Sequence, residues 1–247
     1  MGDIKEKFKS VFAEIVDSGK YTDSSLYGGK YVQLFEKELR QYLLKDTVVV
    51  DSGTSALIIS LKLAGVKCGD EVIIPAYGFI ATKNAVLALQ AKPVYVDIDH
   101  DTFCMSMDDF WDRHYEKAKA VILVDLYGNI CEKPVYWGRT PIIEDACQAF
   151  NTIKEIRSHF TAFSFYPTKQ INTMEGGAIA CKRPAEVRLQ RTYPNGLNYR
   201  MPEINAAMGY LQMLEFEPKE IPKKHYNYTL SPEGDCPIAD KVASNPW

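Results

Sequence analysis

The fold is decided by the sequence SFYPTKQ at residues 164–170, which the triplet EGG at residues 175–177 closes. Residues 160–165 are aromatic and β-prone, which predicts a buried strand. Pro167 cannot continue a central strand, so we expect a turn that places Lys169 at the strand's end. Partial burial there favours the neutral amine that Schiff-base chemistry requires. The alternative is a solvated loop lysine, which is the usual state of this residue type.

Length and charge are those of an ordinary globular enzyme. A chain of 247 residues allows one large domain, with or without a small appendage. Its 29 basic and 32 acidic residues are well mixed and leave a net charge of -3, so we expect neither a nucleic-acid surface nor a polybasic membrane patch. The amino terminus lacks the apolar core of a signal peptide, and no apolar run approaches membrane-spanning length. We therefore predict a cytoplasmic protein with no nucleic-acid or membrane partner.

The cysteines are widely spaced, with no pair at two-residue separation and no cysteine-histidine cluster. This spacing favours reduced thiols over a zinc site or a disulfide framework, so no metal is expected. The six residues are Cys68, Cys104, Cys131, Cys147, Cys181 and Cys236.

Short apolar strands alternate with helical patterns along most of the chain. Strands are predicted at residues 47–50, 71–75, 93–97, 120–126, 160–165 and 177–181, with a further one that starts at residue 141 and ends in acid. Helices are predicted at residues 4–17, 32–43, 77–90 and 106–117, through Ala64, from Pro184 and around residues 203–214. This alternation is typical of a mainly parallel (mixed) sheet with helices on both faces, so we predict an α/β protein built as a three-layer α/β/α sandwich. From Glu217 onward prolines interrupt a polar stretch, and no second domain is expected there.

The sequence DSGTSAL at residues 51–57 joins a strand to a helix. A glycine turn with hydroxyl groups at a helix start directs backbone N–H groups and the positive end of the helix dipole toward one point, which suits a phosphate. A plain N-cap explains the same residues equally well. Ligands of parallel sheets bind beyond the carboxyl ends of the strands, where both this turn and residues 77–79 are expected. There is neither a P-loop lysine nor a G-x-G-x-x-G motif.

A second polar group follows the strand that starts at residue 141. Asp145 at its end is either solvated or, if directed into a cofactor pocket, paired with a buried cation. Gln148, three residues further on, could reach the same ligand.

Taken together, these segments resemble the DegT/DnrJ-type sugar-nucleotide aminotransferases, a family of fold type I enzymes that use pyridoxal 5'-phosphate. The resemblance is carried by SGTSAL at 52–57, GDEVIIP at 69–75, PVYVDID at 93–99, EDACQA at 144–149, residues 164–169 with EGG at 175–177, and NYRM at 198–201. These segments come in the family's order and cover residues 8–216. The resemblance implies a PLP-dependent transferase fold type I large domain at residues 1–216. Residues 217–247 would be a short tail, the remnant of a small C-terminal domain that is otherwise largely missing.

The resemblance implies roles at the ring end of the cofactor. Lys169 would bind the cofactor covalently and shuttle the proton during the reaction. Asp145 would pair with the pyridine nitrogen and keep it protonated. Gln148 would hydrogen-bond the ring hydroxyl, and Phe79 would stack on the ring.

At the other end of the cofactor, Thr54, Ser55 and Ser164 would hold the phosphate. In the family an asparagine that matches Asn198 reaches the phosphate from the neighbouring subunit. The resemblance therefore implies a homodimer with shared active sites.

The implied activity is transfer of an amino group, with glutamate as the expected donor, to a nucleotide-linked keto sugar in amino sugar biosynthesis. One alternative is a catalytically impaired PLP-binding or regulatory homologue that lacks the sugar pocket. Another is a dehydratase that uses the pyridoxamine form of the cofactor. Lys169 argues against the dehydratase, because relatives with that chemistry replace the lysine.

Overall fold

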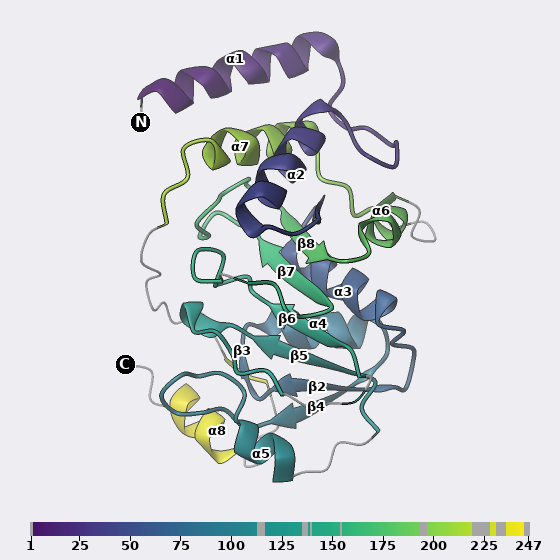
Figure 1. Cartoon of the computed structure of the whole chain (residues 1–247), viewed down its shortest axis with the longest axis vertical. Helices are drawn as coiled ribbons and strands as arrows, with labels where there is room; N and C mark the ends of the chain where they lie inside the picture. Colours follow the sequence, from purple (N-terminus) through teal and green to yellow (C-terminus); the bar gives the residue numbers. More distant parts are fainter. Residues whose placement is uncertain are drawn as a thin grey trace.

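The computed structural model describes residues 2–112, 117–134, 138, 140–153, 155–192, 197–218, 228–230 and 236–244. Its main sheet has seven strands in the order β1-β8-β7-β6-β5-β2-β4 (Figure 1). These strands are β1 (Thr47–Val50), β2 (Glu71–Pro75), β4 (Lys92–Val96), β5 (Ala120–Val124), β6 (Ile142–Asp145), β7 (Phe160–Ser164) and β8 (Gly177–Cys181). All neighbours from β4 to β7 are parallel, whereas β8 is antiparallel to both β7 and β1. The mainly parallel, mixed sheet is therefore confirmed.

Helices connect the strands and cover the sheet (Figure 1). They are α1 (Gly2–Ser18), α2 (Lys30–Leu43), α3 (Gly53–Leu63), α4 (Ile80–Ala88), α5 (Met107–Asp112), α6 (Pro184–Thr192), α7 (Glu203–Met213) and α8 (Pro237–Ser244), with a short 3-10 turn, η1 (Leu126–Gly128). The helix predicted at residues 106–117 is described only to Asp112, since residues 113–116 lie outside the described part of the chain. No helix among the described residues has the length and apolar character needed to cross a bilayer.

Among the described residues, the two largest buried cores lie on opposite faces of the sheet. Val48 and Val50 of β1 belong to the core beneath α3 and α4, whereas Val49 belongs to the core beneath α2 and α7. Alternate residues of a strand point to opposite faces, so this division places helices on both sides of the sheet. In the core beneath α2 and α7, the Phe35 ring occupies the space that a side chain at Gly209 of α7 would need. The glycine therefore lets α2 approach α7 closely. The predicted three-layer arrangement is confirmed.

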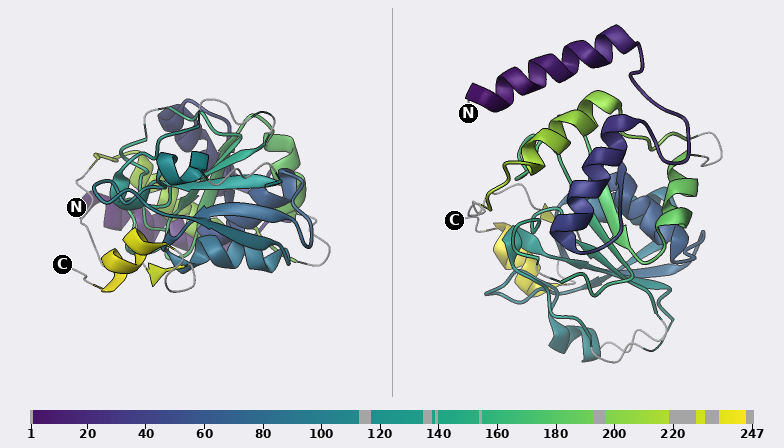
Figure 2. Two further views of the ribbon diagram at one scale, coloured as in Figure 1. Left: turned by 90° about the horizontal axis from the view of Figure 1, so that it is seen from below. Right: turned by 45° about the horizontal axis from the view of Figure 1, so that its top comes forward.

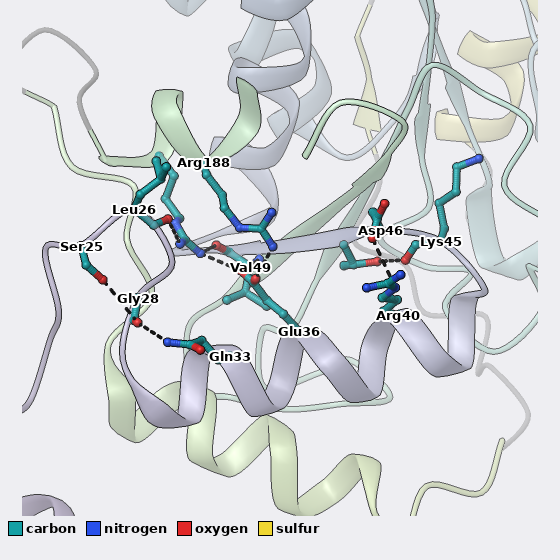
Figure 3. Close-up of polar contacts among 12 residues, drawn as sticks. Ser25, Leu26, Gly28, Gln33, Glu36, Arg40, Lys45, Asp46, Val49 and Arg188 are labelled. Atoms are coloured by element: carbon teal, nitrogen blue, oxygen red, sulfur yellow. Dashed lines mark hydrogen bonds and ion pairs between the residues drawn. The ribbon is translucent and has the colours of Figure 1, made fainter. Parts of the chain in front are cut away.

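A buried ion pair covers the free edge of the sheet at β1 (Figure 3). Glu36 accepts the Val49 N–H at 3.1 Å, and Arg191 donates to the Val49 carbonyl at 3.1 Å. Arg191 Nη1 lies 2.7 Å from Glu36 Oε1, and Arg188 Nη2 lies 2.8 Å from Oε2. Burial lowers the pKa of the Arg191 guanidinium, and the Glu36 charge opposes this effect. Side chains thus take the hydrogen bonds that an eighth strand would make.

Two short strands differ from the sequence prediction. Residues 77–79 were expected to open a helix, but Tyr77–Gly78 form β3, which pairs antiparallel with β9 (Tyr228–Thr229), and α4 starts only at Ile80. The extended backbone of Phe79 at the N-cap of α4 separates the strand from the helix. Tyr77–Gly78 form a strand because they pair with a segment 150 residues away in sequence. The local sequence pattern around residue 77 does not indicate this pairing.

The described part of the tail packs against the large domain. The Asp97 carboxylate accepts the N–H groups of Ile238 and Ala239, both at 2.9 Å, and so caps the start of α8. Leu230 and Ala239 are buried in the core beneath α3 and α4. Figure 2 shows α8 and β9, in yellow, side by side. Residues 219–227, 231–235 and 245–247 of the predicted tail lie outside the described residues, and its interpretation as a domain remnant stays a prediction.

Candidate functional site

A cavity of about 660 Å³ opens at the carboxyl ends of the central parallel strands. It is bordered by the start of α3, the N-cap of α4 and the segments that follow β5, β6 and β7. Because β8 runs in the opposite direction, the residues that precede it, Glu175 and Gly176, lie at the same edge. Of the residues predicted for the site, Thr54, Phe79, Asp145, Gln148, Ser164 and Lys169 line this cavity.

Lys169 reaches the cavity from a tight turn. Its backbone N–H donates to the Tyr166 carbonyl at 2.8 Å, which closes a four-residue turn with Pro167 in the second position, as such turns favour. The side chain is half-buried. The strand, the turn and the placement of the lysine at its end agree with the sequence prediction.

Asp145 is a buried carboxylate that faces the same cavity. Its Oδ2 accepts the Thr82 hydroxyl at 2.8 Å, and its Oδ1 accepts the Cys147 N–H at 3.2 Å. The residue is 6% exposed, and no lysine or arginine in the described part of the chain forms an ion pair with it. Burying a charge is costly unless it is paired, so this carboxylate suits a ligand that brings a cationic group.

Cys147 lies between the two sides of the cavity. Burial raises the pKa of its thiol well above the usual range, and the nearby Asp145 charge adds to the effect. The thiol therefore stays protonated near neutral pH and is a poor nucleophile. A Cβ at Gly53 would lie 3.0 Å from the Cys147 sulfur and 2.9 Å from Ser164 Cβ, so glycine is needed for this close approach.

The start of α3 forms another part of the cavity wall. Ser52 Oγ accepts the Ser55 N–H at 3.1 Å as an N-cap, and the first-turn amides of Gly53 and Thr54 have no acceptor within the helix. Ser55 does not line the cavity. Its hydroxyl is buried and lies 2.8 Å from Ser52 Oγ. A Cβ at Gly177 would lie 2.5 Å from the Ser52 carbonyl, which explains why β8 begins with glycine.

Gln148 and Phe79 complete the walls. Gln148 Oε1 accepts the Tyr127 N–H at 2.9 Å, so its amide NH₂ is the end that can donate to a ligand. Tyr127 has φ of 55°, a left-handed conformation that turns the chain directly after β5. The Tyr127 hydroxyl lies 3.4 Å from that of Tyr77, and burial raises the pKa of Tyr77 above its usual value. Phe79 is 46% exposed and offers its ring at the cavity edge.

Asn198 lies away from this cavity. It is exposed, and its Oδ1 accepts the Arg200 N–H at 3.0 Å. This position is compatible with a role in a second subunit, which stays a prediction.

Sequence reasoning missed Ser52, Thr82 and Tyr127. Ser52 was recognised only within the helix-start motif, where an N-cap hydroxyl beside a glycine turn was the available signal. Thr82 left no usable signal, because it stands beside two other polar residues of α4, Lys83 and Asn84. Tyr127 left none, since its backbone bond to Gln148 depends on the packing of two loops.

A second carboxylate lies buried behind the cavity wall. Asp125 is fully buried; its Oδ1 accepts the Cys131 N–H at 2.8 Å, and its Oδ2 has no hydrogen-bond partner among the described residues. Burial, reinforced by the charge of Glu144, raises the pKa of Asp125 to about 8. The folded protein therefore holds a proton on Asp125 that the unfolded chain releases near pH 4.

Asp125→Asn should change how stability depends on pH. Because the folded-state pKa is raised, the contribution of Asp125 to stability is fully present below pH 4 and is lost as the pH rises toward 8. Relative to wild type, the variant should gain roughly 1.4 kcal/mol of unfolding free energy per pH unit between pH 5 and 7, and less per unit as the pH approaches 8. Urea unfolding at several pH values measures this, with Asp101→Asn, at an exposed carboxylate, as the control. Parallel stability curves for wild type and Asp125→Asn would contradict the assignment.

Comparison with known proteins gives a consistent result. The sequence model of the DegT/DnrJ/EryC1/StrS aminotransferase family matches residues 2–230. The 3-oxo-glucose-6-phosphate:glutamate aminotransferase of Bacillus subtilis is 32% identical over 231 residues, which are 84% of this chain and 51% of that protein. The GDP-perosamine synthase of Escherichia coli O157:H7 is 32% identical over 210 residues, or 75% of this chain and 58% of that protein.

Structural comparison agrees. The crystal structure of NtdA from Bacillus subtilis with bound cofactor PMP superposes with a TM-score of 0.72 at 32% identity, covering 86% of this chain and 53% of that one. The chain therefore spans little more than half the length of the relatives it matches.

Proposed function

The chain belongs to the DegT/DnrJ/EryC1/StrS aminotransferase family, and from this premise we propose that it is a PLP-dependent aminotransferase that transfers an amino group to a keto sugar. The observation that carries the proposal is the buried Asp145 carboxylate, which faces the same cavity as Lys169 and forms no ion pair with a lysine or arginine of the described residues. The alternative of an impaired PLP-binding homologue is not favoured, because the relatives above are named as an aminotransferase and a synthase of an amino sugar.

The residues present fit pyridoxal phosphate. The unpaired carboxylate of Asp145 suits a protonated pyridine nitrogen, and Lys169 supplies the one amine needed for a covalent link to an aldehyde. Ser52, Thr54 and Ser164 surround the amide groups at the start of α3, which is a favourable place for a phosphate. The residue types that line the cavity therefore suit both the ring and the phosphate of the cofactor.

When bound, the cofactor supplies a sink for the electrons released when a carbon–hydrogen bond of the amino donor breaks. Asp145 holds the proton on the ring nitrogen and thereby strengthens that sink. Lys169 Nζ would be the base that accepts the proton from the donor carbon and the acid that gives it back later in the reaction. The amide NH₂ of Gln148 would orient the ring by donating to its oxygen, and Phe79 would cover one ring face, since both residues line the cavity.

We propose glutamate as the donor and a nucleotide-linked keto sugar as the acceptor. The donor proposal is supported by the Bacillus relative, whose name includes glutamate, and the acceptor proposal by the GDP-perosamine synthase. The Bacillus relative is named for a sugar phosphate instead, so a phosphorylated keto sugar is the competing acceptor.

Reconstitution tests the proposal. Purified protein mixed with pyridoxal phosphate should develop the absorbance band of a lysine-linked cofactor near the visible edge. Glutamate should then convert the band to that of the pyridoxamine form, and a panel of keto sugars, nucleotide-linked or phosphorylated, should restore it with an amino sugar detected by mass. A protein that forms no band contradicts cofactor binding. A band that glutamate leaves unchanged would support the impaired homologue.

We also propose a cytoplasmic homodimer in which Asn198 serves the partner's site. Asn198→Ala should lower cofactor affinity about tenfold without changing secondary structure, because one hydrogen bond to a charged phosphate is lost. Equilibrium dialysis with circular dichroism measures both, and Asn84→Ala, at an exposed position of α4, is the matched control. A protein that sediments as a monomer yet is fully loaded with cofactor would contradict the shared site.

A further inference from the structure

We propose that Thr82 is a positioning residue of the cofactor site, which acts through its hydrogen bond to Asp145. The inference rests on the proposed function, because it concerns the carboxylate that pairs with the ring nitrogen. Neither the sequence motifs nor the family resemblance drew attention to Thr82.

The hydroxyl of Thr82 has one defined partner. Its Oγ1 donates to Asp145 Oδ2 at 2.8 Å, and the residue is fully buried. A buried hydroxyl without a partner is costly, and a hydrogen bond to a charged group is stronger than one between neutral groups. The contact therefore stabilises the Asp145 carboxylate in addition to filling space in the core.

One helical turn supplies both the wall of the cavity and this bond. The Thr82 N–H donates to the Phe79 carbonyl at 3.1 Å, and Phe79 and Ala81 of the same turn line the cavity. Thr82 points toward Asp145, so this one turn positions both the Phe79 ring and the carboxylate.

The two hydrogen bonds of Asp145 leave its carboxyl plane little freedom. Cys147 N–H holds Oδ1 from the same loop, and Thr82 holds Oδ2 from α4. Without the bond from Thr82, only the hydrogen bond from the Cys147 N–H would orient the Asp145 carboxylate. A carboxylate free to rotate would pair less well with the ring nitrogen, and the ring would then withdraw electrons less strongly.

Thr82→Val tests the inference, because valine keeps the shape and removes only the hydroxyl. Three quantities should be measured after reconstitution with pyridoxal phosphate: the dissociation constant, the melting temperature, and the pH midpoint of the absorbance change of the lysine-linked cofactor. We expect roughly tenfold weaker binding, because a carboxylate that is free to rotate loses part of its charge-assisted interaction with the ring nitrogen. We also expect the midpoint to move to higher pH, because a less electron-poor ring holds the proton of the linkage more tightly.

Two further variants separate positioning from structure. Thr82→Ser keeps the hydroxyl and should restore both the affinity and the midpoint. Thr192→Val is the matched control, because the Thr192 hydroxyl is buried without a partner among the described residues; it should leave both values unchanged.

The outcomes are distinguishable. Wild-type affinity and midpoint in Thr82→Val would overturn the role of Thr82 and leave the proposed function standing. Equal impairment of Thr82→Ser and Thr82→Val, with a lower melting temperature and an unchanged midpoint, would reduce Thr82 to a structural residue and also overturn it. Wild-type protein that binds no pyridoxal phosphate would overturn the proposed function itself, and the inference with it.

Discussion

Replacement of Lys169 by alanine is expected to remove the absorbance band of the lysine-linked cofactor and to slow amino transfer by at least about 10³-fold. The substitution removes two functions of the same Lys169 Nζ: covalent attachment of the cofactor and transfer of the proton during catalysis. Pyridoxal phosphate should still bind without a covalent link, because Asp145 and the start of α3 remain in place. Reduction with borohydride followed by mass analysis shows whether the protein carries the cofactor covalently.

Lys182→Ala is the matched control for this experiment, because Lys182 is an exposed lysine directly after β8 and outside the cavity. It should behave as wild type. Added small amines should restore part of the proton transfer in Lys169→Ala, since they can occupy the space of the missing side chain. A band that persists in Lys169→Ala would show that another amine holds the cofactor.

The second large effect concerns stability. Arg191→Met should lower the free energy of unfolding by about 3 kcal/mol, because the buried Glu36 loses its closest cation and keeps only Arg188. The Val49 carbonyl loses its partner as well, and so does the Leu26 carbonyl, which Arg191 holds at 2.9 Å. Urea unfolding monitored by circular dichroism measures the change.

Arg40→Met provides the control, because Arg40 forms a surface pair with Asp46 at 3.3 Å and its side chain is 68% exposed. Such pairs contribute roughly 0–1 kcal/mol.

The double variant Glu36→Met/Arg191→Met separates two explanations. If the pair only balances its own charges, the double variant should recover most of the loss. We expect it to remain destabilised, because the N–H and carbonyl of Val49 would then both lack partners. Equal costs for Arg191→Met and Arg40→Met would refute the structural role.

The sequence predicted those features that depend on local composition. Residues 177–181 form a strand with the predicted bounds, since a glycine pair and two charged residues enclose an apolar run. The direction of that strand had to come from the structure, because an apolar run has the same pattern in a parallel and an antiparallel sheet. Tyr77–Gly78 were misassigned for a related reason, as their partner lies in the tail.

The candidate site shows the same division. Lys169 and Asp145 were found because each follows a strand in a recognisable motif, and the cavity includes both. Thr82 was not found, because its bond to Asp145 spans 63 residues and the helix pattern does not indicate which side chain faces the sheet. Two predicted site residues do not line the cavity. The predicted role of Asn198 depends on a second subunit, and the Ser55 hydroxyl lies against that of Ser52.

The reversed direction of β8 has a consequence for how this architecture can diversify. Parallel strands deliver only the loops that follow them to the reactive edge, and the loops that precede them go to the far edge. Because β8 runs in the opposite direction, residues 175–176, which precede it, contribute to the cavity. Lys182 and Arg183, which follow it, lie at the far edge together with residues 66–70 before β2. Changes in length at the far edge can therefore accumulate without disturbing chemistry, whereas an insertion just before β8 would alter the reactive pocket directly.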